Sequence, residues 1–100
     1  MIMENIFENA YYGKPYMCRN NTIAYYCRYV EETKKHALMV NDPENDFVEC
    51  LPNGHVYDIE LFDKPILMKD GKEISAYEKF GWNREEMKDF RLDIISEYLD

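Results

Sequence analysis

The side chains able to do chemistry in this sequence are three cysteines, two histidines and a set of carboxylates. Structural zinc sites take their ligands from short knuckles such as C-x-x-C, and the sequence contains none. A cysteine nucleophile needs a histidine beside it, and no local signature indicates such a pair. We therefore predict no metal, no cofactor and no enzymatic activity for the residues concerned, which are Cys18, Cys27, His36, Cys50 and His55.

Three acids, Asp42, Glu44 and Asp46, have the alternate spacing of a calcium-binding loop. Such a loop needs glycine at its sixth position and glutamate at its twelfth, where this sequence has Phe47 and Asn53. A calcium site of that kind is therefore excluded, and the acids need another interpretation.

Charge is the more informative property of this segment. Residues 42–63 hold seven acids and no lysine or arginine, so they carry nearly all of the formal net charge of -8. A field of that sign disfavours duplex DNA and anionic membranes as partners and attracts a basic protein surface. The predicted partner-binding residues are Asp42, Glu44, Asp46, Glu49, Asp58, Glu60 and Asp63.

Tyrosines and arginines of the N-terminal third provide an alternative site. Aromatic faces beside guanidinium groups can stack on and pair with a nucleotide or single-stranded nucleic acid. The tyrosines can equally fill a core, or contact another protein or a second copy of the chain as a homodimer. The residues of the alternative ligand-binding site are Tyr16, Arg19, Tyr26 and Arg28.

The elements that must position these residues are mainly strands. Residues 22–30 (TIAYYCRYV) are rich in β-branched and aromatic side chains, and a polar connection precedes a returning strand over 36–40, so we expect an antiparallel hairpin. A shorter strand begins at Tyr16. Within 22–30, alternation predicts that the odd-numbered residues from 23 share one face and the even-numbered residues from 24, Tyr26 and Arg28 included, share the other.

A second hairpin is predicted where Asn53 and Gly54 separate 47–51 from 56–62, because both central residues of a type I′ turn take positive φ. In its second strand, alternation would bury residues 57, 59 and 61 and expose Asp58 and Glu60. The sequence thus places the acids on a sheet.

The C-terminal part contains weaker signals. Asp70 and Gly71 indicate a turn, Gly81 suits the end of a helix, and Asn83 with Glu86 indicates a helix start. Apolar residues then recur at helical spacing as far as residue 98, although a strand over 92–98 is the alternative. With 46% hydrophobic residues, the chain can form a single domain over 1–100. The predicted fold class is mainly β (α+β), a small SH3-like barrel or rolled antiparallel sheet with one short C-terminal helix.

Two stretches, NAYYGKPYMCR over 9–19 and LDIISEY over 92–98, resemble a class of small proteins of gut bacteria and their phages. That class shares a G-K-P-Y-x-x-R start and a D-I-V-S-E-W end. The resemblance implies a mainly β domain in a phage or mobile-element setting and supplies no catalytic residues. This chain departs from the pattern in having Tyr98 where tryptophan is usual and in its longer middle, 63–91.

From these observations we expect a non-enzymatic acidic interaction protein. In this hypothesis it is a phage or mobile-element inhibitor, of the anti-defence or anti-CRISPR type, whose carboxylate face competes with nucleic acid for a basic host protein. The alternative is a small nucleotide or single-stranded nucleic-acid binding module. No secretory signal or apolar span is expected, and the odd set of three cysteines fits a reducing compartment, so we expect a cytoplasmic location.

Overall fold

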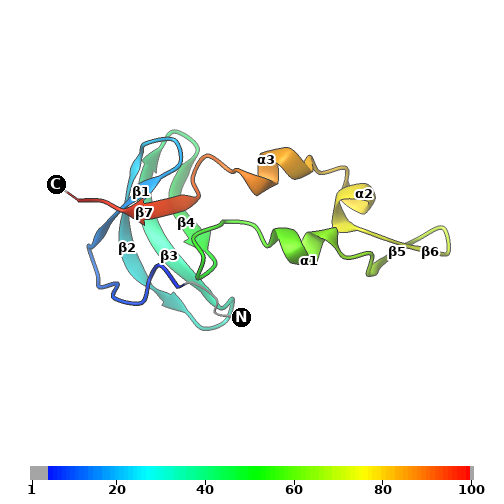
Figure 1. The fold of residues 1–100 in the computed structure, drawn as a ribbon, viewed down its shortest axis with the longest axis horizontal. Helices are drawn as coiled ribbons and strands as arrows, with labels where there is room; N and C mark the ends of the chain where they lie inside the picture. The colour runs from blue at the N-terminus through cyan, green and yellow to red at the C-terminus, as the bar shows by residue number, and fades with distance from the viewer. Residues whose placement is uncertain (1–4, 100) are drawn as a thin grey trace.

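The chain, described over residues 5–99 by a computed structural model, forms a five-stranded antiparallel sheet with a long excursion on one side (Figure 1). The strand order is β4-β3-β2-β1-β7. The predicted mainly β class with a rolled antiparallel sheet is confirmed, and the sheet does not close into a barrel. Its strands are β1 (Pro15–Cys18), β2 (Ile23–Val30), β3 (Lys35–Asp42), β4 (Asn45–Cys50) and β7 (Ile94–Glu97).

Residues 57–91, which we call the arm, leave the sheet after β4 and return at β7 (Figure 1). The arm makes the molecule elongated, 52 × 32 × 23 Å, with a radius of gyration of 15.1 Å. A compact domain of this length would have a radius of gyration of about 13 Å. The arm consists of α1 (Ile59–Asp63), β5 (Leu67–Lys69), β6 (Lys72–Ile74), α2 (Ala76–Phe80) and α3 (Arg84–Lys88).

Capping residues set the ends of the arm's short helices. Asn83 accepts hydrogen bonds from the first backbone N–H groups of α3, and Ser75 does the same for α2. Gly81 takes a left-handed conformation with φ 71° and ends α2. The predicted helix signals at Gly81 and Asn83, and the turn between β5 and β6, are confirmed.

The predicted second hairpin is wrong. Residues 56–62 do not pair with β4; Asp58 instead caps α1 by accepting a hydrogen bond from the Leu61 N–H. Among the residues with positive φ, Gly54 is present and Asn53 is not, so the turn is not type I′. The free conformation of Gly54 serves a different purpose, described below.

The C-terminal end is also different from the single helix that was expected. Within residues 5–99 there are three short helices, and α3 ends at Lys88. The helical spacing of apolar residues beyond it is coincidental, because residues 94–97 form β7 beside β1. The strand alternative for this region is the one the structure has.

The core lies on the concave side of the sheet and is built from aromatic rings and small apolar residues. Phe7, from the N-terminal turn, packs its ring 5.2 Å from Tyr16 and 5.8 Å from Tyr26. Leu38 and Leu92 are fully buried beside them. The N-terminal turn therefore covers the core at the open side of the rolled sheet.

A β-bulge at Cys27 divides β2 into two halves that use opposite faces. Tyr26 pairs with Leu38, but Arg28 already pairs with Ala37, so one residue is inserted. Beyond the bulge Tyr29 lies across from the buried His36, with rings 5.0 Å apart, and Arg28 is exposed. The simple alternation expected for residues 22–30 is therefore correct as far as Tyr26 and wrong after it.

The buried carboxylate of Asp93 connects the chain segments that meet where the rolled sheet ends. Its side chain is 1% exposed and accepts hydrogen bonds from the Val56 N–H at 2.9 Å and from Arg19 Nη2 at 3.1 Å. His55 Nδ1 lies 3.1 Å from the same carboxylate. Since Arg19 follows β1 and His55 follows β4, Asp93 joins three separate stretches of chain.

Gly54 lies against the start of β7, where Ile94 donates its N–H to the Gly54 carbonyl oxygen at 2.8 Å. A Cβ at this position would overlap the Ile94 carbonyl oxygen. Its φ of +91° is in addition one that residues with a side chain rarely adopt. The asparagine–glycine pair thus permits a close approach of two backbones.

We predict that Gly54→Ala lowers the free energy of unfolding by about 3 kcal/mol or more, from backbone strain and steric overlap together. Gly71→Ala is the matched control, since Gly71 has φ +78° with open space around it, and it should lose only about 1 kcal/mol. Urea titrations followed by far-ultraviolet circular dichroism measure both. Equal losses in the two variants would contradict the close approach.

We predict that Asp93→Ala is severely destabilising, by about 3 kcal/mol, because Arg19 and His55 lose their shared acceptor and the Val56 N–H is left without a partner. Asp63→Ala removes an exposed ion pair and should leave the free energy of unfolding nearly unchanged. The same urea titrations apply, and a stable Asp93→Ala protein would show that the carboxylate does not fasten the roll.

Candidate interaction surface

The first two of the predicted partner-binding acids lie at the turn between β3 and β4 and are neutralised by the arm. Arg91 Nη2 lies 3.1 Å from Asp42 Oδ2 and 3.4 Å from Glu44 Oε2. Burial of Asp42 opposes ionisation, but its hydrogen bonds from Arg91 and Asn45 outweigh that and hold its pKa below the ordinary value. The contacts of Arg91 with Asp42 and Glu44 therefore connect the arm to the sheet.

The acids of α1 have mainly local roles. Arg84 donates two hydrogen bonds to Asp63, at 2.7 and 2.9 Å, and these lower the pKa of that carboxyl group. Asp58 caps the helix. Glu60 is exposed and has no ion-pair partner among the described residues.

Asp46 and Glu49 lie on the edge strand β4, and both are exposed. Glu49 accepts a hydrogen bond from the Thr33 hydroxyl at 2.8 Å, and neither acid has an ion-pair partner within residues 5–99. The seven acids are therefore spread over a turn, a strand and a helix, and three of them are paired with arginine.

The four residues of the alternative ligand site do not form one surface. Tyr16 is fully buried and Tyr26 is 7% exposed, so neither ring offers a face to a base. Arg19 is held by Asp93, and Arg28 projects from the opposite face of the sheet to the two tyrosines. The tyrosines fill the core, which was the competing interpretation of the pattern.

Tyr26 and His36 form a buried hydrogen bond, with the hydroxyl oxygen 2.8 Å from His36 Nδ1. Burial lowers the pKa of His36, so the imidazole is neutral in the folded protein at neutral pH. This pair supplies a polar contact inside an otherwise apolar core.

Two of the three cysteines have the properties of small core residues, whereas Cys27, at the bulge of β2, is partly exposed. Cys18 and Cys50 are fully buried, and burial raises the pKa of Cys18 to about 11 and that of Cys50 further. A thiol in that state is a poor nucleophile and a poor metal ligand. Among residues 5–99 no group of three histidines, cysteines or acids is placed to hold a metal ion.

The convex, outer face of the sheet has a surface that sequence analysis did not identify. In an exposed antiparallel face, alternate residues are usually polar. Here Tyr25, Met39 and Phe47 are aligned in register across β2, β3 and β4. Tyr25 is 45% exposed and Phe47 58% exposed, so this row is open to solvent.

The apolar row continues onto β1, where Pro15 pairs with Tyr25 and Met17 pairs with Ile23. All three of Pro15, Met17 and Ile23 are partly exposed. The next row across the sheet contains Arg28, Ala37 and Glu49, which places one cation and one carboxylate at the border. We call these residues together, Pro15, Met17, Ile23, Tyr25, Arg28, Ala37, Met39, Phe47 and Glu49, the outer face.

Comparison of the chain with protein-family models, with curated protein sequences and with solved structures gave no match. The two stretches on which the family resemblance depends are nevertheless adjacent in space. β1 pairs with β7, Arg19 pairs with Asp93, and Lys14 Nζ lies 2.7 Å from Glu97 Oε1. Among residues 5–99 no helix combines the length and the apolar character that a membrane span requires.

We predict that stability decreases as the pH falls below about 6.5, because the unfolded chain, with an unshifted His36, binds the proton before the folded chain does. The decrease continues until the folded imidazole is itself protonated. Urea titrations by circular dichroism between about pH 7.5 and 5.5 measure this dependence. His36→Gln should flatten it; an unchanged pH dependence in that variant would show that His36 is not the group responsible.

Proposed function

We propose that the protein is a non-enzymatic interaction protein that binds another protein through the outer face of its sheet. The observation that carries the proposal is the exposed row of Tyr25, Met39 and Phe47. Contiguous exposed apolar surface is uncommon on a protein without a binding role. Aromatic residues and methionine are also the types enriched at protein interfaces.

The chemistry of the border favours a partner with basic groups. Asp46 and Glu49 lie near Phe47 on β4, and neither acid has an ion-pair partner in the described chain. The net charge of -8 adds long-range attraction to such a partner. The outer face would therefore supply the apolar contact, and the acids of β4 would supply orientation and a faster encounter.

Inhibition of a basic host protein by competition with nucleic acid is the finer form of the proposal. Fewer acids are available to a basic partner than the sequence suggested, because Asp42, Glu44 and Asp63 have arginine partners. Four of the seven acids have no arginine partner among residues 5–99; of these, Asp58 caps α1, and Asp46, Glu49 and Glu60 are exposed. A phage or mobile-element setting follows only from the resemblance of residues 9–19 and 92–98.

We predict that Phe47→Asp weakens binding to the partner by about 30-fold or more, because the row loses its most exposed ring and gains a charge. The partner is identified by capture on tagged wild-type protein, purified, and titrated against each variant by calorimetry. Tyr12→Asp is the matched control, since Tyr12 is 73% exposed but lies outside the sheet, and it should bind as wild type does.

Circular dichroism first verifies that both variants are folded. Retention of the partner by Phe47→Asp, or equal loss in both variants, would overturn the assignment of the outer face. Affinity that falls steeply with added salt in the wild type, and less steeply in Glu49→Gln, would locate the charged part of the contact at β4.

A further inference from the structure

The edge of β7 that faces away from β1 is separate from the outer face. Among the strands of residues 5–99, β7 is the last of the sheet and pairs only with β1. Ser96 pairs with Met17, and Tyr98 donates its N–H to the Pro15 carbonyl oxygen, so the backbone groups of these two residues face β1. The alternation of an antiparallel ladder then directs the N–H and C=O groups of Glu97 to the opposite edge.

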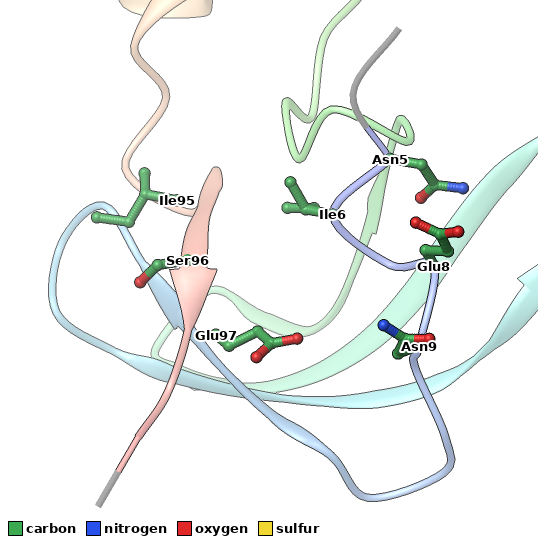
Figure 2. Close-up of a pocket in the computed structure, with 7 residues that line it drawn as sticks. All are labelled: Asn5, Ile6, Glu8, Asn9, Ile95, Ser96 and Glu97. Atoms are coloured by element: carbon green, nitrogen blue, oxygen red, sulfur yellow. The ribbon is translucent and has the colours of Figure 1, made fainter.

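This edge borders a cleft of about 380 Å³ between β7 and the N-terminal turn (Figure 2). Residues 95–97 line one wall, about 10 Å of strand, and residues 5–9 contribute the other. The start of β7 is closed by its hydrogen bond to Gly54, so the open edge begins at Ile95. An extended chain entering this cleft would meet the N–H and C=O groups of Glu97, which have no backbone partner among residues 5–99.

The wall opposite β7 is held in place by the core. Ile6 donates its N–H to the Pro52 carbonyl oxygen at 3.0 Å, and the Phe7 ring is 3% exposed among the core aromatics. The Asn5 side chain accepts a hydrogen bond from the Phe7 N–H at 2.9 Å and tightens the turn. The cleft is therefore formed before any ligand binds, which lowers the entropy lost on binding.

The charges in the cleft determine which occupant fits. Figure 2 shows the Glu97 side chain directed from β7 toward Asn9, with Ile6 between the two walls. Glu97 is paired with Lys14, whereas Glu8 is exposed and has no ion-pair partner within residues 5–99. A second copy of the chain would bring further carboxylates to this acidic cleft. A basic peptide would instead supply the missing cation.

We propose that the free edge of β7 binds an extended, basic peptide segment of another protein as a sixth strand of the sheet. Its backbone pairs with Glu97, a lysine or arginine pairs with Glu8, and an apolar side chain contacts Ile6. Addition of a strand to an exposed edge is an established mode of peptide recognition, in which the main chain supplies affinity and the side chains supply specificity. The site lies at the opposite end of the strand order from Phe47 and does not depend on the outer face.

The test uses the full chain and three acetylated, amidated peptides: one of alternating lysine and valine, one with glutamate in place of lysine, and the basic peptide with a central proline. Titration by fluorescence anisotropy should show binding of the first peptide only, because the second has the wrong charge and the third loses a ladder hydrogen bond. Amide hydrogen exchange by NMR should slow at Glu97 when the basic peptide is bound.

Glu8→Lys should weaken the basic peptide at least tenfold, whereas Glu60→Lys, an equal charge change on exposed α1, should not. Phe47→Asp should leave this binding unchanged, so failure here is distinguishable from failure of the outer face. Equal weakening by Glu8→Lys and Glu60→Lys, unchanged exchange at β7, or no binding of the basic peptide would overturn the proposal. Self-association through β7, detected by sedimentation, would assign the edge to a second copy instead.

Discussion

The rolled sheet depends on one buried charge. Asp93 sits at the point where β1, the segment after β4 and the start of β7 converge, and its two oxygens bind groups from Arg19, His55 and Val56. A buried carboxylate is tolerable only when its acceptor sites are filled. Because the partners come from positions far apart in the sequence, this requirement specifies the topology as well as stabilising it.

The same convergence explains how a long arm can be inserted into a small sheet. The chain leaves at Val56 and returns at Asp93, and those two residues are hydrogen-bonded to each other. Gly54 and Ile94 are joined in the same place. The sheet therefore has its edges fixed by residues on both sides of the arm, and Arg91 with Asp42 adds a tie at the other end of β4.

Most elements could be predicted from neighbouring residues. Features that depend on contacts between distant parts of the chain could not. The hairpin of β2 and β3, the turn between β5 and β6, and the caps at Gly81 and Asn83 follow from neighbouring residues. Gly54 resembled a hairpin glycine, but its conformation serves a contact with Ile94, forty residues away. The bulge at Cys27 reversed the face of Arg28, and no residue type marks that insertion in advance.

For the candidate surfaces, too, properties of neighbouring residues could be predicted and contacts between distant residues could not. Charge counting located the acids correctly but could not show that Arg84 and Arg91 would return to neutralise Asp63, Asp42 and Glu44. The sequence did not indicate the outer face because that surface joins residues from four strands, whose register only the structure supplies. In both cases the missing information was which side chains from distant parts of the chain become neighbours.

The position of Trp82, the only tryptophan, determines what a spectroscopic experiment on this protein observes. Its ring lies in the arm, stacked on Phe80 at a centroid distance of 4.9 Å and tilted against Phe62 at 5.1 Å. Within 57–91 only Ala76 is buried, and helices of five residues are not stable alone, so the arm is expected to open at a lower free energy than the sheet. Tryptophan emission thus follows the arm, and circular dichroism at the strand band follows the sheet. Two midpoints that fail to coincide would report two units of one chain with different stabilities, and neither midpoint alone would describe the whole protein.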